Sequence, residues 1–295
     1  MLHLELELVS QCRLSLVWYN ARMTTVLTKV FLEEAYVKQG LSTWAIEKKF
    51  GISRSRVHAS LRRHGIPTRT IAQSHIRYKR SDFSGDLVEK AYLLGFAIGD
   101  LRVRNHNGAR SMTISIGCGS TKPAQIELVR QLFSKYGRVW VGSPDKRGAV
   151  NVEAFVNKSF SFLLKPNRTH DWCASSRKYF FAFLAGFTDA EGSFFLTRNQ
   201  ARVAWGNYDT RVLSFIRDTL NKFGIQSPNI VCDSLKGVIG THGFPRNNNY
   251  CHITCARKDV VRDLVVQLEP YIRHADKRVA LAKIRDNLIV RGVSL

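Results

Sequence analysis

The sequence predicts an α+β protein in which a small all-helical domain precedes a duplicated unit of helices and strands. Three observations support this fold class: two similar segments lie 91 residues apart, alternating apolar and polar residues follow them, and residues 27–68 carry helical spacing alone. We therefore divide the chain into an N-terminal extension, a helical domain, a linker and two halves of the duplicated unit, with the boundaries 1–26, 27–68, 69–86, 87–176 and 177–295.

The composition indicates a polyanionic partner. The chain has 295 residues, of which 45 are Lys or Arg and 23 are Asp or Glu, so its formal net charge is +22. With 44% hydrophobic residues it can bury a sizeable core, which excludes disordered, collagen-like and low-complexity proteins. Each basic group set against a phosphate gains from counterion release, so nucleic acid is the favoured partner and an anionic membrane surface the competing one.

Two further features bear on the compartment. No apolar run reaches the roughly 18–20 residues that cross a bilayer, and residues 1–10 alternate Leu with Glu, unlike a signal peptide. The six cysteines lack paired spacing, which fits a reducing compartment; they are Cys12, Cys118, Cys173, Cys232, Cys251 and Cys255. We expect an intracellular protein of the cytoplasm, the nucleoid or an organelle matrix, neither secreted nor bound to a membrane.

The helical domain has three predicted helices. They span residues 27–39, 43–50 and 54–64, each followed by a glycine, with Ser42 or Thr43 and Ser53 as N-caps. The last two helices, joined through Gly51, resemble a helix-turn-helix DNA-binding module. In this resemblance the third helix contacts DNA through Arg54, Ser55, Arg56, His58, Arg62 and Arg63.

The basic residues are densest in and after this module. Residues 48–81 hold ten Lys or Arg and no Asp or Glu, and we expect the linker to lie along DNA. Glu47 departs from the module, because a small residue usually stands there to let the two helices approach. The alternative is a helical bundle whose basic face is only solvated.

Each repeated segment carries small residues at every fourth position. They are Ala91, Gly95 and Gly99 in one copy and Ala182, Gly186 and Ala190 in the other. Such residues share one face of a helix, and a face almost without side chains lets two helix backbones approach closely. We expect these two helices to form an interface.

An acid ends each motif, Asp100 in the first copy and Glu191 in the second. If the helices pair, the two carboxylates meet at the negative ends of both helix dipoles, which is costly unless a cation neutralises them. Hard carboxylate oxygens suit Mg²⁺ (or Mn²⁺), and Mg²⁺ takes one or two protein carboxylates and completes its shell with water and phosphate oxygens. Asp100 and Glu191 are therefore predicted to bind the metal that promotes phosphodiester hydrolysis.

The second motif, residues 184–192, resembles the signature of the LAGLIDADG homing endonucleases almost residue for residue. Residues 93–101 are a looser copy, with Gly99 for Ala and Leu101 for Gly. The resemblance covers about residues 87–291 and implies a pseudo-symmetric duplicated αββαββα fold whose two antiparallel sheets form a saddle on double-stranded DNA. It further implies a monomer with an internal pseudo-two-fold axis that cuts both strands of a long site, and a structural role for Asp189.

Other segments repeat as the resemblance requires. Residues 129–137 and 216–224 are amphipathic helices ending in a glycine, 111–116 and 150–156 alternate as strands, and 275–290 has the spacing of a packing helix. The resemblance implies that polar residues of the sheets contact DNA. These are Arg102, Arg104, Thr113, Ser115, Arg198, Gln200 and Arg202, with the loop 246–249 as a further contact.

The family tends to place a Lys in the loop after each last strand or helix, where it polarises the scissile phosphate. Lys165 and Lys277 are the nearest candidates for this catalytic role. Ala275 stands where the second of these lysines is expected, so the match is poor there.

The residues leave other functions open. An intron RNA maturase would use the same basic surface with intron RNA as its partner, and a DNA-binding regulator would keep the fold without catalysis. A membrane-surface protein would need an amphipathic helix with a large apolar face, whereas the basic block has turn signals.

Isolated Cys and His residues suggest no second site. Zinc at residues 251–255 is disfavoured because Cys251 and Cys255 share one face of a predicted strand, where buried cysteine is ordinary. The isolated histidines His106, His170 and His274 are expected on the surface.

Overall fold

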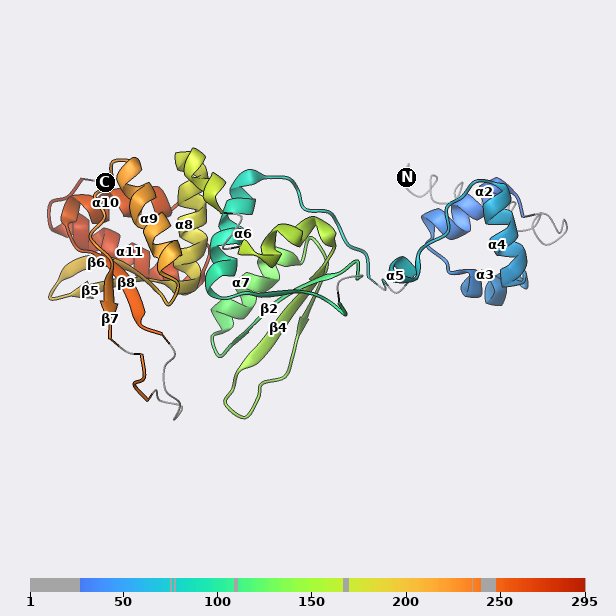
Figure 1. Ribbon diagram of the computed structural model, residues 1–295, viewed down its shortest axis with the longest axis horizontal. Coiled ribbons are helices and arrows are strands. Elements are labelled where there is room, and N and C mark those ends of the chain that lie inside the picture. The colour runs from blue at the N-terminus through green and yellow to red at the C-terminus, as the bar shows by residue number, and fades with distance from the viewer. Residues whose placement is uncertain are drawn as a thin grey trace, which may run out of the picture. The chain divides into compact units, whose positions relative to one another are not determined.

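The computed structural model describes residues 27–294, apart from 75, 77, 109–110, 167–169, 235 and 240–247. The N-terminal extension, and Arg246 and Asn247 of the predicted DNA-contacting loop, lie outside the described residues. The chain divides into two compact units, which we call the helical unit (Met1–Arg77) and the duplicated unit (Tyr78–Leu295) (Figure 1). No helix in the described part of the chain is both long and apolar enough to cross a lipid bilayer.

The helical unit is built from short helices. Its elements are α2 (Lys29–Leu32), η1 (Glu33–Lys38), α3 (Thr43–Phe50), α4 (Arg54–Arg63) and α5 (Ile71–Ser74). The Ser42 hydroxyl caps α3 by accepting a hydrogen bond from Ala45 N, 3.0 Å away, and Gly51 ends that helix with a φ of 70°. Ile46, Val57 and Leu61 lie in one buried core, which holds α3 and α4 together.

Glu47 fits between α3 and α4 because it caps the start of α4. Its carboxylate lies 2.9 Å from Arg54 Nε and accepts a hydrogen bond from Arg54 N at 3.4 Å. Ser53, the predicted cap of α4, makes no side-chain capping hydrogen bond. The larger residue is therefore accommodated at the turn and takes the role that was expected of Ser53.

The duplicated unit repeats one order of elements. The first half contains α6 (Leu87–Gly99), β1 (Arg102–Asn105), β2 (Ile114–Ser120), α7 (Pro123–Phe133), β3 (Arg138–Val141), β4 (Val150–Val156), η2 (Lys158–Leu164) and η4 (Asp171–Ser175). The second half contains α8 (Arg177–Glu191), β5 (Gly192–Thr197), β6 (Gln200–Asn207), α9 (Thr210–Lys222), β7 (Val231–Asp233), β8 (Tyr250–Cys255), α10 (Lys258–Leu268) and α11 (Ala275–Val290). Each half thus follows its motif helix with strand, strand, helix, strand and strand.

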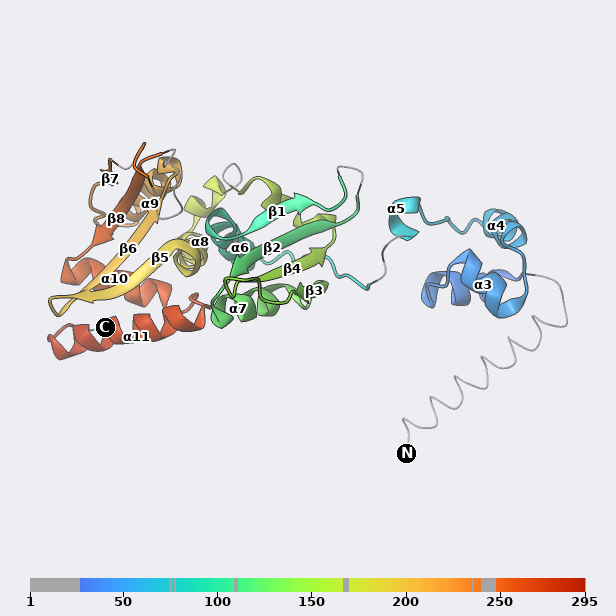
Figure 2. The ribbon, with the colours of Figure 1, turned by 90° about the horizontal axis from the view of Figure 1, so that it is seen from below.

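Each half forms one antiparallel sheet. The strand order is β1-β2-β4-β3 in the first, which we call sheet A, and β5-β6-β8-β7 in the second, sheet B. Helix α7 and η2 cover one face of sheet A, and α9, α10 and α11 cover one face of sheet B (Figures 1 and 2). The face of each sheet turned away from these helices is its open face. The duplicated α+β fold predicted from the sequence is confirmed.

Burial along the elements follows the expected alternation with one shift. Val152, Ala154 and Val156 are fully buried, and α11 spans the predicted residues with Leu281 and Ile284 facing the core. The strand predicted at 111–116 instead begins at Ile114 and runs to Ser120, so its first residues precede the sheet.

Two cysteines are paired although the cysteine spacing indicated no disulfide framework. Cys232 and Cys251 form a disulfide, because the register of β7 and β8 places them directly opposite each other. Cys118, Cys173 and Cys255 are buried free thiols.

Two histidines expected on the surface are buried instead. His170 stacks on Phe183 with ring centroids 5.4 Å apart, and His274 accepts a hydrogen bond from Asp276 N as the N-cap of α11. An isolated histidine in the sequence does not reveal such packing partners, because they come from distant elements.

Candidate functional site

Helices α6 and α8 meet through their glycines at the centre of the duplicated unit. A Cβ atom at Gly95 would lie 2.0 Å from Phe183 O, and one at Gly186 would lie 2.0 Å from Tyr92 O. These are backbone contacts that no side-chain adjustment can relieve. The predicted small-residue stripes therefore face each other, and in both views the two helices run side by side (Figures 1 and 2).

The close approach brings the two motif acids to one place. Asp100 is the C-cap of α6, and Glu191 is the last residue of α8. A Cβ atom at Gly99 would lie 2.5 Å from Ala190 Cβ and 2.7 Å from Glu191 Cγ. Burial and the negative charge of Asp100 raise the pKa of Glu191 to about 7, so Asp100 is close enough to act on Glu191.

Asp100 has a hydrogen-bond donor that the sequence analysis missed. Gln125 Nε2, on the first turn of α7, lies 2.7 Å from Asp100 Oδ2. Burial raises the pKa of Asp100, while this hydrogen bond and the charges of Lys277 and Lys122 oppose the rise. Gln125 fixes one carboxylate oxygen and leaves the other for a ligand.

Two lysines supply positive charge at the acids. Lys277, on the first turn of α11, donates a hydrogen bond to Gly192 O, and its charge acts on both Asp100 and Glu191. Burial lowers the pKa of Lys277, and so does the neighbouring charge of Lys122, the N-cap of α7. Lys277 is thus placed where the sequence analysis put a catalytic lysine, although Ala275 precedes it at the expected position.

Lys165 lies elsewhere. It is exposed at the end of η2 and is not among the cations that act on Asp100 or Glu191. In the first half the positive charge beside Asp100 comes from Lys122, which was not predicted from the sequence. Lys122 follows the end of β2, and β2 pairs with β1, the strand that follows Asp100. That placement is the signal by which Lys122 could have been found.

Asp189 holds the start of α11 in place. Its Oδ2 accepts hydrogen bonds from Tyr92 Oη at 2.5 Å, Arg273 N at 2.7 Å and His274 N at 3.1 Å. The side chain is buried, and burial raises its pKa to about 6 against these hydrogen bonds. The structural role expected of Asp189 is confirmed, and the segment that it anchors leads directly to Lys277.

The two motif acids fit a hard divalent cation. Among the described residues, no group of three or more His, Cys, Asp and Glu side chains is arranged to hold a metal ion. Two carboxylates suffice for Mg²⁺, because water and phosphate oxygens complete its shell. Burial and the charge of Asp100 raise the pKa of Glu191 although the charge of Lys277 opposes the rise, and a divalent cation between the two carboxylates would lower it.

The open face of sheet A carries charged residues in register across the strands. Arg102 and Arg104 on β1 are exposed there, as is Arg138 on β3. Thr113 and Ser115, predicted to contact DNA, are buried, and both are engaged within the protein. Arg80 Nη1 donates to Thr113 Oγ1 at 2.6 Å, and Ser115 Oγ donates to Glu153.

Part of the predicted linker belongs to the duplicated unit. Tyr78 stacks on the guanidinium of Arg138, 4.3 Å from the ring centroid, and Ser81 N donates to Tyr136 O at 3.0 Å. Phe83 N donates to Ser159 Oγ at 2.8 Å, and its ring packs on Phe160. Residues 78–83 are therefore docked beside sheet A.

Sheet B presents a different open face. Arg198 and Gln200 are exposed at the β5–β6 turn, where Arg198 has a φ of 49°. Arg202 is half-buried opposite Phe195, and its Nε has no hydrogen-bond partner among the described residues. These predicted contact residues lie on one hairpin, with fewer charges around them than on sheet A.

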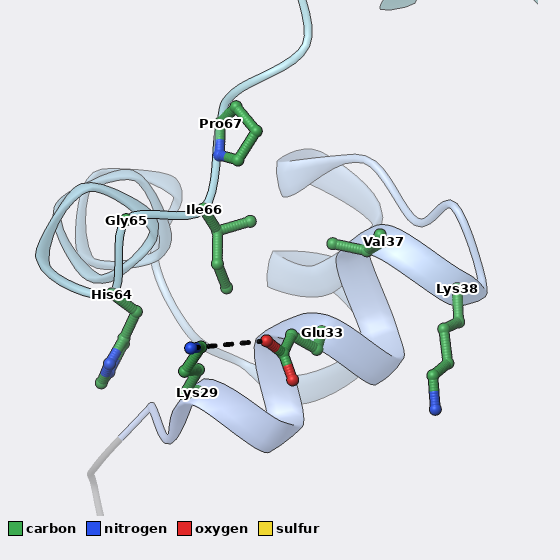
Figure 3. A pocket seen from close by; sticks show the side chains of 8 residues that line it. All are labelled: Lys29, Glu33, Val37, Lys38, His64, Gly65, Ile66 and Pro67. Atoms are coloured by element: carbon green, nitrogen blue, oxygen red, sulfur yellow. Dashed lines mark ion pairs between the residues drawn. The ribbon is translucent and has the colours of Figure 1, made fainter.

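In the helical unit the six predicted DNA-contacting side chains of α4 are all exposed. Arg69, from the same basic block, is structural: it donates to Tyr36 O, Gly40 O and Leu41 O at 2.7–2.9 Å. A surface pocket of about 380 Å³ lies beside η1 and the turn after α4, lined by Lys29, Glu33, Val37, Lys38, His64, Gly65, Ile66 and Pro67 (Figure 3). None of the predicted DNA-contacting residues of α4 lines this pocket.

Comparisons with known proteins give one family match. The model of the LAGLIDADG-like domain matches residues 179–237. No curated protein matches the sequence.

Several solved structures are similar. I-DmoI in complex with DNA and Ca is 17% identical, with 67% of this chain and 98% of that chain covered and a TM-score of 0.48. The homing endonuclease I-WcaI bound to its DNA recognition sequence is 14% identical, with 66% and 86% covered and a TM-score of 0.43. The N-terminal LAGLIDADG domain of DUF199/WhiA is 16% identical, with 62% and 84% covered and a TM-score of 0.42.

The family match begins within α8, ends after β7 and contains the second motif with Glu191. The first half repeats the same elements around Asp100 and joins the second through paired glycines. The second half therefore carries the match to a LAGLIDADG-like domain, and the first half repeats its order of elements in the same polypeptide.

Proposed function

We propose that the protein is a sequence-specific, Mg²⁺-dependent endonuclease that hydrolyses one phosphodiester in each strand of a long double-stranded DNA site. The observation that carries this proposal is the meeting of Asp100 and Glu191 at the α6–α8 interface, one acid from each half. Two similar halves that each supply one acid match a duplex, whose two strands present two similar phosphates. The net charge of +22 supplies the attraction to DNA.

The described residues can prepare such a reaction. A bound divalent cation would lower the pKa of a water molecule and neutralise charge that develops on the phosphate. Gln125 holds one oxygen of Asp100, and the interface fixes Glu191 beside it. Lys277 and Lys122 place positive charge where a phosphate approaches the acids. The open faces of the sheets and helix α4 supply the surfaces that bind and select the DNA.

The test is cleavage of a plasmid library that carries a randomised insert. The full-length chain with Mg²⁺ should linearise a sequence-restricted fraction of the library, and EDTA should prevent this. Asp100→Asn and Glu191→Gln should bind the selected duplex in Ca²⁺ without linearising it. Glu127→Gln, an exposed acid on α7, is the matched control and should cut normally. Binding without cleavage by the wild type would instead favour a DNA-binding regulator.

A further inference from the structure

The open face of sheet A contains one acid among its basic residues. Glu153, on β4, lies directly opposite Gly117 on β2, which in turn lies opposite Arg102 on β1. A Cβ atom at Gly117 would lie 3.4 Å from Glu153 Cγ, so the glutamate side chain rests across this glycine. Its carboxylate is thereby directed along the sheet towards the neighbouring row of residues.

Two donors hold the Glu153 carboxylate from that row. Arg104 Nη2 lies 3.0 Å from Glu153 Oε1, and Ser115 Oγ donates to the same oxygen. Burial raises the pKa of Glu153, but these two hydrogen bonds outweigh it, so the pKa is lowered and the carboxylate stays ionised. No described donor reaches Oε2, which remains available at the open face.

The ion pair is only partly shielded from solvent. The Arg104 side chain is 57% exposed and the Glu153 side chain 18%, so water screens the pair from the arginine side. An acid on a DNA-facing surface also repels phosphate. A fixed carboxylate on this face can accept a hydrogen bond from a base, because bases present amino groups in the major groove.

We propose that Arg104 and Glu153 together recognise one G·C base pair in the major groove, Arg104 donating to guanine and Glu153 Oε2 accepting from the cytosine amino group. The inference rests on the proposed function. Guanine O6 and cytosine N4 are about 2.9 Å apart because they are hydrogen-bonded to each other. Arg104 Nη2 lies 3.0 Å from Glu153 Oε1, so a donor group and an acceptor group stand side by side on the open face.

Ser115 is a positioning residue in this arrangement. It is buried, and its hydroxyl donates to Glu153 Oε1. Ser115 therefore acts on the base pair through the glutamate, although the sequence analysis placed it in direct contact with DNA. Removing its hydroxyl leaves Arg104 in place but frees the carboxylate to rotate.

The experiment compares base preferences on duplexes selected from a randomised library with the full-length wild-type chain in Ca²⁺. Binding is then measured on a panel that substitutes every position of the selected site in turn. Glu153→Gln and Arg104→Ala should each lose roughly 5- to 100-fold discrimination at one and the same G·C pair and keep the preferences elsewhere. With Glu153→Gln the preference should shift towards adenine, because Gln pairs with adenine N6 and N7. Ser115→Ala should lose part of the discrimination at that pair.

Matched controls are Glu127→Gln and Arg130→Ala, which remove the same charges from an ion pair on α7, on the covered side of sheet A. Both should keep every base preference. Unchanged preferences in Glu153→Gln and Arg104→Ala would overturn the inference while leaving the proposed function intact, and so would an equal loss at all positions. A wild-type chain that selects no sequence would refute the proposed function itself. Thermal unfolding of each variant shows whether the fold is retained.

Discussion

The two halves of the duplicated unit each supply one acid, but they hold it differently. In the first half, Gln125 on the first turn of α7 donates to Asp100. Val212 occupies the corresponding third position of α9, and no described side chain donates a hydrogen bond to Glu191. The N-cap of α7 is Lys122, whereas the N-cap of α9 is Asp209, so the nearest helix start is basic in one half and acidic in the other.

The second half obtains its positive charge from an added helix. Lys277 lies on α11, and the first half ends in the short elements η2 and η4 in the corresponding place. Asp189, two residues before Glu191, anchors the start of α11, while Ile98 stands at the corresponding position before Asp100. A duplicated fold can therefore keep its two acids and still support each of them through different elements.

The largest expected effect lies at the interface that both halves share. Gly186→Ala places a Cβ atom 2.0 Å from Tyr92 O and should destabilise the protein by more than about 3 kcal/mol or prevent folding. Gly119→Ala is the control, because its Cβ would meet the Asn151 side-chain oxygen at 3.1 Å. Thermal unfolding measures both. Equal stability of the two variants would mean that α6 and α8 do not pack as described.

The anchor of α11 should give the next largest effect. Asp189→Ala leaves the donors of Tyr92, Arg273 and His274 without their acceptor and should cost roughly 2–4 kcal/mol. Ile98→Ala, at the corresponding place in the first half, should cost less because Ile98 is only half-buried. Denaturant unfolding of the two variants compares them, and a larger loss for Ile98→Ala would contradict the role given to Asp189.

Substitution of Lys277 or of Lys122 should change the cleavage rates of the two DNA strands differently. Lys277 acts on both acids and Lys122 on Asp100, so Lys277→Met should slow cleavage of both strands and Lys122→Met mainly one. We expect reductions of roughly 10- to 100-fold, the range for losing one positioned electrostatic group. Duplexes labelled on either strand report each rate. Lys165→Met is the comparison variant. If it cleaved DNA more slowly than Lys122→Met, Lys165 would be the catalytic lysine of the first half, as predicted from the sequence.

Gln125 should set the pH dependence of the first half. Its hydrogen bond lowers the pKa of Asp100, so Gln125→Leu should raise that pKa and shift the acid limb of the cleavage profile to higher pH. Val212→Ala, at the corresponding place in the second half, should leave the profile unchanged. Cleavage rates across pH 5–8 measure the shift, and an unchanged profile in Gln125→Leu would remove Gln125 from the site.

The last expected effect is on stability without metal. The folded pKa of Glu191 is about 7, above its ordinary value of 4.5, so the folded state binds more protons between these values. Stability in EDTA should therefore fall as pH rises from about 4.5 to about 7 and then level off, and Mg²⁺ should stabilise the protein more at pH 7 than at pH 5. Glu191→Gln should flatten this part of the melting-temperature profile. A rise in stability over the same pH range in EDTA would contradict a raised pKa of Glu191 in the folded state.

Repeated local patterns made much of the fold predictable. The small-residue stripes gave α6 and α8 and their pairing, and the alternation at 150–156 gave β4 with its correct bounds. The caps Ser42 and Gly51 bounded α3 because capping depends on residues a few positions away.

The supporting shell of the acids was not predictable in the same way. Gln125, Lys122 and the start of α11 reach the acids only through the fold, and nothing in their own neighbourhood marks them. Thr113 and Ser115 have polar side chains suited to DNA, yet Arg80 and Glu153 already engage them. The Cys232–Cys251 disulfide likewise follows from the register of two strands and not from cysteine spacing.

The most direct test of the central claim is linearisation of a selected plasmid by the wild type and by the two acid variants, in Mg²⁺ and in EDTA. We expect linear product from the wild type in Mg²⁺ alone. We expect none from Asp100→Asn or Glu191→Gln, although both should bind the site in Ca²⁺. Linear product at the wild-type rate from either variant would contradict the claim that Asp100 and Glu191 form the catalytic metal site.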